Sequence, residues 1–297
     1  MSVVAMTELL QRAVSGRYAI GYFESWDQYS LEAAIEAAEE SSAPAIIGFG
    51  GAVTNQVWLD HCGVETMAGL ARCLAEKATV PTAVLFNEAR TLEQLARGFR
   101  SGCNTLMLDT SALPNDQNLE WTRKVVELAH SGGAAVEAEL GHLADGTDPA
   151  VHAHGTDPVE AAWFVRESGV DALAVSIGNV HILSDGEAKV DLDLLSNIHQ
   201  STTVPLVIHG GTGYPAAAVK GAIERGVAKF NVGTRLKQVY LNGIADAISR
   251  ISNHPNIHRV MGSRELDDVF VVGKSALKSE IKRMMNLYGT IGQAQNW

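Results

Sequence analysis

The sequence predicts a (β/α)8 TIM barrel with a C-terminal helical extension, on three observations. The chain has 297 residues, which is typical of one such barrel. Short apolar segments alternate with helical patterns from one end of the chain to the other. Most of these apolar segments lack polar alternation, as strands buried on both faces do. A doubly wound open sheet is the second choice, because it shows the same order of elements.

Eight apolar segments are expected to form the barrel strands. The first four are 18–23, 44–49, 82–86 and 105–109. The second four are 134–140, 172–178, 205–211 and 229–233. Helical patterns with a period of 3.6 residues lie between them, and several end at a glycine, which readily adopts the left-handed conformation that stops a helix.

No linker-like or low-complexity segment divides the chain, so a single domain over residues 1–297 is expected. The barrel should occupy about 18–252 and a helical tail about 253–297. A long loop at 141–158 has no clear periodicity and is expected to act as a lid.

Composition limits the class of protein. The chain is 46% hydrophobic but only 6% aromatic, which suits a large core of small aliphatic side chains. A formal net charge of −11 argues against nucleic acid as a partner. No segment approaches the roughly 20 apolar residues of a membrane span, and no signal peptide is evident. Cys62, Cys73 and Cys103 form no CxxC pair, so reduced thiols and a cytoplasmic location are predicted.

Polar residues stand at the C-terminal ends of the predicted strands, where barrels place their active sites. These residues are Glu24, Asn87, Glu88, Asp109, Glu137, Glu139, His181, His209 and Asn231. Two imidazoles and several carboxylates that converge on one rim suit a divalent metal ion. A single histidine there would more often be structural, but His181 and His209 together favour a metal site.

Two glycine motifs follow the last two predicted strands. They are "HGGTG" at 209–213 and "NVGT" at 231–234, and each leads into a helix. Glycines allow the backbone to approach a ligand closely, and the N–H groups of a helix N-terminus favour an anion. Each motif alone could be only a tight turn. The pair, after strands seven and eight, predicts a phosphate site.

Several segments resemble the class II, metal-dependent ketose-bisphosphate aldolases, which act on fructose and tagatose bisphosphates. Among them are "DTSALPNDQNLEWTRKVVELAH", "VEAELG", "GVDALAVSIGNVH", "VPLVIHGGTG" and "GVAKFNVGT". The similarity runs from about Tyr18 to Ile244. It implies an aldehyde-lyase in which a divalent ion, Zn²⁺ before Mn²⁺, Co²⁺ or Fe²⁺, polarises a ketose phosphate and stabilises an enediolate. It also implies a homodimer or homotetramer.

The resemblance assigns roles to individual residues. His181 and His209 match the second and third metal ligands, and Glu88 stands at the first. Asp109 and Glu139 match acidic residues near the metal and could supply a second metal position. The residues that match the phosphate loops are Gly210, Gly211, Thr212, Asn231, Gly233 and Thr234.

The first metal motif departs from the family pattern. Where the family has His-x-Asp-His-Gly, this chain has Leu85-Phe86-Asn87-Glu88-Ala89. Asn87 therefore stands at the catalytic aspartate, and an amide cannot take up a proton. The proton acceptor is expected to be Glu24, or a lid residue; the lid residues considered are Asp145, Asp148, His152 and His154.

Other departures accompany this one. Glu24 stands at an expected asparagine, Gly50 near an expected serine, and Ile182 at an expected glycine. No basic residue for a distal phosphate is evident apart from the candidate positions Arg259 and Arg264, so a substrate with one phosphate is favoured.

Three functions fit these residues. The favoured one is a carbon–carbon lyase of non-standard specificity, with doubtful activity on fructose 1,6-bisphosphate, because Glu88 still completes a metal-ligand set. The alternatives are a sugar-phosphate isomerase or epimerase and a catalytically silent sugar-phosphate-binding homologue. Asn87 or Glu88 could also simply cap a helix, but capping does not explain the two histidines opposite.

Overall fold

The computed structural model describes residues 2–147, 154–183, 185–252 and 255–297. Eight parallel strands close into a barrel in the order β1-β10-β9-β7-β5-β4-β3-β2, so the predicted barrel is confirmed. The barrel strands are β1 Ile20–Ser25, β2 Ala45–Gly50, β3 Thr82–Ala89, β4 Thr105–Leu108, β5 Ala135–Leu140, β7 Ala172–Val175, β9 Leu206–Ile208 and β10 Val227–Val232. They lie at the eight predicted apolar segments.

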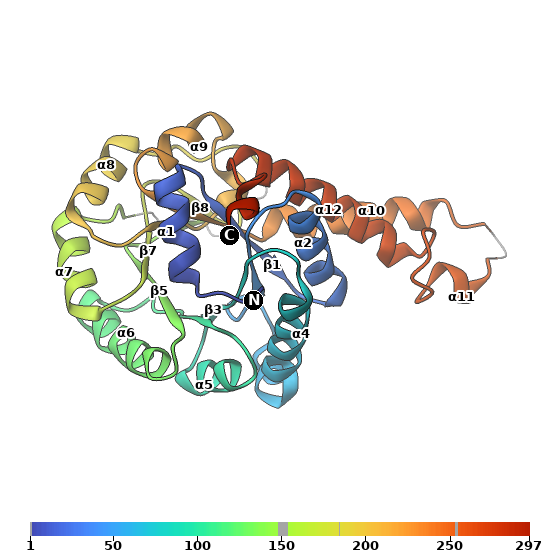
Figure 1. Cartoon of the computed structure of the whole chain (residues 1–297), viewed down its shortest axis with the longest axis horizontal. Helices are drawn as coiled ribbons and strands as arrows, with labels where there is room; N and C mark the ends of the chain where they lie inside the picture. Colours follow the sequence, from blue (N-terminus) through green and yellow to red (C-terminus); the bar gives the residue numbers. More distant parts are fainter. Residues whose placement is uncertain (1, 148–153, 184, 253–254) are drawn as a thin grey trace.

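Helices surround the barrel on its outside (Figure 1). They are α2 Gln28–Glu40, α4 Val64–Lys77, α5 Leu92–Arg100, α6 Asn115–His130, α7 Pro158–Ser168, α8 Leu192–Ser201, α9 Ala216–Ile223 and α10 Thr234–Ser249. Shorter elements are α3 Gln56–Trp58, the π-helical turn η1 Leu59–Gly63, and the 3₁₀ turns η2 Gly211–Gly213 and η3 Gln293–Asn296. Within the expected lid, β6 Ala144–Asp145 pairs with β8 Val180–His181.

Helix α1, Met6–Gly16, closes the N-terminal end of the barrel and was not predicted. Its residues Met6, Leu9 and Leu10 are fully buried against inward-facing strand residues such as Ile20. The spacing of these apolar positions is that of a helix face, so the signal was present in the sequence. Because α1 covers this end, the barrel is accessible to a ligand from the other.

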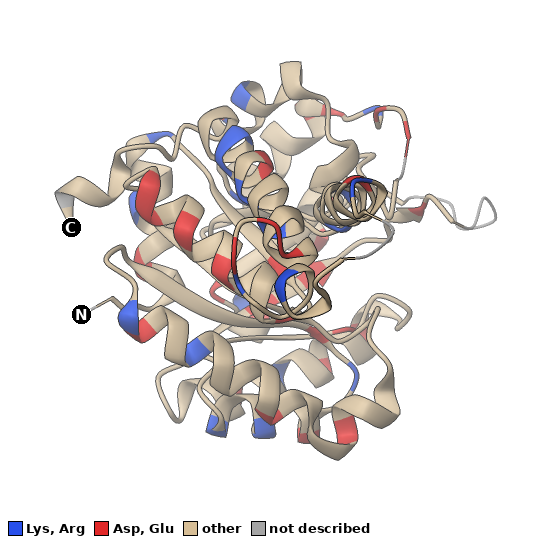
Figure 2. Ribbon diagram, turned by 90° about the vertical axis from the view of Figure 1, so that its right-hand side faces the viewer, with Lys and Arg blue, Asp and Glu red and all other residues tan. Residues whose placement is uncertain are grey.

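The C-terminal segment forms α11 Ile257–Val260 and α12 Val269–Leu287. Helices α10 and α12 run side by side and extend beyond the barrel, with α11 at their far end (Figure 1). Helix α12 also packs on α2, where acidic and basic side chains pair in a row: Glu32, Glu36 and Glu40 with Lys274, Lys278 and Lys282. Charged residues of both signs lie mainly on such outer helices (Figure 2). No helix in the described ranges is long and apolar enough to cross a membrane.

Candidate active site

A cavity of about 750 Å³ lies at the C-terminal end of the barrel. Most of the predicted site residues line it: Glu24, Asn87, Glu88, Asp109, Glu139, His181, His209, Gly210, Thr212, Asn231, Gly233 and Thr234. Gly211 lies in η2, directly beside this lining. His154 is exposed and exchanges backbone hydrogen bonds with His142. It is not among the residues that line the cavity. His152 and Asp148 lie outside the described residues.

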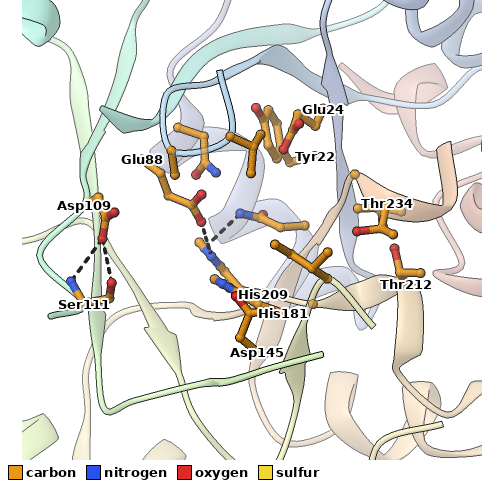
Figure 3. A pocket seen from close by; sticks show the side chains of 18 of the residues that line it. Tyr22, Glu24, Glu88, Asp109, Ser111, Asp145, His181, His209, Thr212 and Thr234 are labelled. Atoms are coloured by element: carbon orange, nitrogen blue, oxygen red, sulfur yellow. Dashed lines mark hydrogen bonds and ion pairs between the residues drawn. The ribbon is translucent and has the colours of Figure 1, made fainter. Parts of the chain in front are cut away.

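Glu88, His181 and His209 form a cluster within this cavity (Figure 3). One ligand atom of each lies within 4.8 Å of those of the other two. Glu88 is near the C-terminal end of β3, His181 ends β8, and His209 directly follows β9. The two imidazole rings are stacked with their centroids 5.5 Å apart. The fold thus brings together the three residues that the sequence proposed as metal ligands.

The backbone is left-handed at one residue of this cluster and at one residue beside it. Glu88 and Ile182, which follows His181, each have a φ of 50°. A β-branched residue is a steric outlier in this region, and the aldolase pattern has glycine at the position of Ile182. Such conformations cost on the order of 1–3 kcal/mol each and persist where the surroundings fix them, as at functional sites. At Glu88 the strain accompanies a register shift between Phe86 and Ala89 in the pairing of β3 with β4.

A buried charged network holds His209. Its Nδ1 lies 3.1 Å from Glu88 Oε1, and its Nε2 lies 2.9 Å from Glu137 Oε1. Lys229 is fully buried and donates to Glu137 Oε2 and to Asn231 Oδ1, each at 2.6 Å. The Asn231 amide nitrogen lies 2.8 Å from His209 Nε2. The imidazole is therefore oriented from inside the barrel by residues of β5 and β10.

Burial and charge set the protonation of the three clustered residues. Burial lowers the pKa of His181, which favours the neutral imidazole that binds metals. Burial opposes ionisation of Glu88, but the hydrogen bond and charge of His209 lower the pKa of this carboxyl to about 2. Burial would also lower the pKa of His209, yet the hydrogen bonds to Glu137 and Glu88 raise it to about 10. A cation bound here would take the place of the His209 proton.

This set of donors fits a divalent metal ion. Two imidazoles and one carboxylate are common ligands of Zn²⁺ and of other first-row metal ions. Nδ1 of His209 faces Glu88, while Nε2 bonds to the Glu137 carboxylate. A carboxylate on the second ring nitrogen is the usual means by which proteins orient a metal-binding histidine.

Glu139 and Asp109 lie at the side of this cluster. Glu139 Oε2 is 3.5 Å from His209 Nδ1, and its Oε1 has no hydrogen-bond partner among the described residues. Burial raises the pKa of Glu139 to about 7. Asp109 Oδ1 instead accepts hydrogen bonds from the backbone N–H and the hydroxyl of Ser111. Its Oδ2 lies 2.5 Å from Arg90 Nη1. The structure therefore places Glu139 next to the cluster and ties Asp109 to other partners.

The two glycine loops lie next to each other, as predicted for a phosphate site. A Cβ on Gly211 would lie 2.8 Å from the Asn231 carbonyl oxygen, so only glycine allows this close approach. Helix α10 begins at Thr234 and has no side-chain cap from its own N-cap residue, Gly233. Thr212 Oγ1 accepts a hydrogen bond from the backbone N–H of Arg235 across the two loops. The first N–H groups of a helix have no acceptor within it, so the N-terminus of α10 beside these loops suits an anion.

Glu24 lies between two glycines at the end of β1. Its Oε2 would be 3.1 Å from a Cβ on Gly50 and 3.0 Å from one on Gly233. Its Oε1 accepts a hydrogen bond from Lys237 at 2.6 Å. Burial raises the pKa of Glu24 and outweighs the effect of Lys237. The carboxylate therefore reaches the cavity through space that side chains at Gly50 and Gly233 would fill.

Asn87 is buried at the C-terminal end of β3 and lines the cavity. Its Oδ1 has no hydrogen-bond partner in the part of the chain that the structure describes. A hydrogen bond from its side chain is among the contributions that lower the pKa of Glu88. The Asn87 amide thus contacts Glu88 and leaves an acceptor oxygen for another group.

Arg90 and Lys237 are cavity residues that the sequence reasoning missed. Both could have been found by continuing past the strand ends, because Arg90 directly follows β3 and Lys237 lies in the first turn of α10. Arg259 and Arg264, considered for a distal phosphate, pair with Asp267 and Glu32 and do not line the cavity.

Fold and site together give a barrel protein in which a cluster that could hold a divalent metal ion lies beside two glycine loops. The chain belongs to the class II fructose-bisphosphate aldolase family, whose model matches residues 4–293. It is 34% identical over 280 residues to a probable fructose-bisphosphate aldolase of Bacillus subtilis, covering 92% of this chain and 96% of the relative. It is 31% identical over 299 residues to a fructose-bisphosphate aldolase of Geobacillus stearothermophilus, covering 99% of each.

Another relative is the uncharacterized protein YdjI of Escherichia coli K12. It is 32% identical over 286 residues, which cover 95% of this chain and 96% of YdjI. The crystal structure described as the YdjI aldolase superposes with a TM-score of 0.82 and 30% sequence identity, over 98% of this chain and 99% of that chain. The predicted family membership is thus confirmed by sequence and by structure.

Proposed function

We propose that this protein is a metal-dependent carbon–carbon lyase that cleaves a phosphorylated ketose other than fructose 1,6-bisphosphate. The observation that carries the proposal is the cluster of Glu88, His181 and His209 beside the two glycine loops. A divalent ion held by these three residues, with Zn²⁺ the first choice, would polarise the ketose carbonyl.

Residues around the cluster have separate tasks in this proposal. The loops at 210–212 and 231–234 hold the substrate phosphate through backbone N–H groups and the hydroxyls of Thr212 and Thr234. Glu139, which lies beside the cluster, could supply a second position for the ion, whereas Asp109 is bonded to Arg90 and Ser111. Asn87 offers its amide oxygen to a substrate hydroxyl instead of accepting a proton.

Glu24 is the proton acceptor that the geometry favours. It lines the cavity, whereas His154 does not, and its pKa is raised by burial, which makes the carboxylate a stronger base. The bond that breaks joins the carbon bearing the proton-donating hydroxyl to its neighbour on the carbonyl side. Glu24 takes that hydroxyl proton as the bond cleaves, so an aldehyde leaves and the electron pair stays on the ketose-derived fragment.

An isomerase or a silent binding protein would also use the phosphate loops. Product analysis separates them, because a lyase yields a triose phosphate and an isomerase leaves the mass of the substrate unchanged. Among the lining residues that the structure describes, none favours either alternative over a lyase.

Metal content tests the ligand cluster. The purified wild-type protein should hold about one divalent ion per chain, and His209→Ala should lose most of it, because one of three protein ligands is removed. Elemental analysis after removal of loosely bound ions measures this. His258→Ala, on exposed α11, is the control and should keep the ion. Equal metal content in wild type and His209→Ala would contradict the proposed site.

The phosphate loops predict which ligands stabilise the protein. Ketose phosphates should raise the melting temperature, because a ligand that binds the native state stabilises it, whereas the free sugars should have little effect. A thermal-shift screen of matched phosphorylated and free ketoses provides the measurement. Stabilisation by the free sugars alone would count against a phosphate site at Thr212 and Thr234.

Removal of the proposed base should lower turnover more than binding. Glu24→Gln should reduce kcat on the ketose phosphate found in that screen by about 10²–10⁴-fold, the usual contribution of a positioned base. The ligand-induced thermal shift should persist. Glu224→Gln, on the outside of the barrel, is the matched control. An unchanged kcat in Glu24→Gln would place the proton acceptor elsewhere, with Asp145 as the next residue to test.

A further inference from the structure

Arg90 stands at the wall of the cavity opposite the phosphate loops. In the barrel order, β3 lies directly across from β9, and β4 directly across from β10. The phosphate loops follow β9 and β10, whereas Arg90 follows β3 and its partner Asp109 follows β4. Figure 3 shows Asp109 and Ser111 on one side of His181 and His209, with Thr212 and Thr234 on the other.

The Arg90 guanidinium is held in place without being enclosed. Its Nη1 donates to Asp109 Oδ2 at 2.5 Å, and its Nη2 donates to the Ala52 carbonyl at 3.3 Å. Asp109 is itself fixed by the backbone N–H and hydroxyl of Ser111. The Arg90 side chain is nevertheless 48% exposed and lines the cavity. A guanidinium has five N–H donors, so donors remain for a ligand.

The charge of the lining selects the kind of anion. Among the described lining residues, the cationic lysine and arginine side chains are those of Lys237 and Arg90. Lys237 is paired with Glu24 beside the phosphate loops. Arg90 is thus the cation at the far end, and Asp109 already balances its formal charge. Asp109 repels any anion at this end, but it repels a doubly charged phosphate about twice as strongly as a singly charged carboxylate. A planar carboxylate also matches the geometry of the guanidinium donors.

We propose that Arg90 binds a carboxylate at the end of the substrate remote from its phosphate. The inference rests on the proposed function for the position of the phosphate, and it names the substrate class as a ketose phosphate that also carries a terminal carboxylate. Asp109 and Ser111 act as positioning residues for the guanidinium. Cleavage then releases an aldehyde that bears the carboxylate.

Three acyclic six-carbon probes that differ only at one end test this proposal by isothermal titration calorimetry. Glucitol 6-phosphate has a neutral far end, 6-phosphogluconate a carboxylate, and glucitol 1,6-bisphosphate a second phosphate. The zinc-loaded wild-type protein should bind 6-phosphogluconate about 10–100-fold more tightly than glucitol 6-phosphate, as expected for charge-assisted hydrogen bonds.

Variants test whether Arg90 causes the preference for the carboxylate probe. Arg90→Met should remove it and leave the affinity for glucitol 6-phosphate unchanged, whereas Arg90→Lys should retain part of it, because a lysine keeps the charge but not the fork. Arg100→Met, the same exchange at the exposed end of α5, should behave like wild type. Unchanged thermal unfolding of Arg90→Met without ligand would show that the fold is intact.

Three results would overturn the proposal. The first is equal affinity of the wild type for all three probes, and the second is tighter binding of the bisphosphate than of 6-phosphogluconate. The third is an Arg90→Met variant that weakens all probes equally, which indicates a structural role. If the carboxylate preference is present and depends on Arg90 but no ketose phosphate is cleaved, the carboxylate subsite stands and the lyase function fails.

Discussion

Fructose 1,6-bisphosphate is expected to be cleaved by the wild-type protein about 10²–10⁴-fold more slowly than by the Geobacillus stearothermophilus relative assayed in parallel. That factor is the usual contribution of a positioned general base, and Asn87 cannot act as one. The distal phosphate of this sugar would also face the Arg90–Asp109 pair, whose formal charges cancel. A coupled assay for triose phosphate measures the rate.

A double variant tests whether the site has lost the family's activity or has gained another. Asn87→Asp with Glu88→His restores the aspartate and the metal histidine of the family pattern. We expect no recovery of fructose 1,6-bisphosphate cleavage, because Glu24 and its partner Lys237 stay in place. Activity on the native ketose phosphate should fall, since Glu88 is one of the three proposed metal ligands.

The matched control makes the same two exchanges outside the cavity, with Asn256→Asp and Glu265→His in exposed segments of the C-terminal arm. Both activities should be unchanged in this control. Wild-type cleavage of fructose 1,6-bisphosphate at the rate of the relative would refute the proposed change of substrate, and Asn87 would then stand beside a base that we have misplaced. Recovery of cleavage in the double variant alone would instead indicate a simple loss of catalysis.

The barrel could be predicted from the sequence because its signal is local. Each strand is a short apolar run, and the alternation with helical periods leaves few topologies. That Glu88, His181 and His209 lie close together could be predicted for the same reason, since strand ends are close in sequence to the polar residues that follow them. His181 departs from this rule, because it lies on β8, which pairs with β6 outside the barrel sheet.

Spatial coupling between distant positions could not be predicted. Glu24, Gly50 and Gly233 were each noted separately, but only the fold shows that the two glycines leave room for the carboxylate. Arg90 was overlooked because its role depends on which strands face each other across the barrel, a property of the closed sheet and not of the adjacent sequence. Side-chain pairs across a barrel are set by packing, which local patterns do not encode.

Lys229→Met is expected to destabilise the protein by about 3–5 kcal/mol, the usual cost of removing one partner from a buried ion pair. The side chains of Lys229 and Glu137 are both fully buried inside the barrel, and Lys229 Nζ lies 2.6 Å from Glu137 Oε2. Without the lysine, the Glu137 carboxylate keeps its contact with His209 but loses its strongest donor, and Asn231 Oδ1 loses a hydrogen bond as well. Urea unfolding of the metal-free protein gives the change in free energy.

Two further variants decide whether this loss comes from the unpaired charge. Glu137→Gln with Lys229→Met removes both charges and should cost less than the sum of the two single changes, because no buried ion is left alone. Lys220→Met, at a side chain that is 89% exposed, should have a free energy of unfolding within about 0.5 kcal/mol of wild type.

Because Glu137 orients His209, Lys229→Met should also weaken metal binding by about 10–100-fold, as loss of an outer partner usually does. A Lys229→Met variant with the stability of Lys220→Met would mean that the barrel interior accommodates the Glu137 charge without the lysine. Metal binding by Lys229→Met as tight as that of the wild type would mean that the Glu137–Lys229 pair has no part in fixing His209.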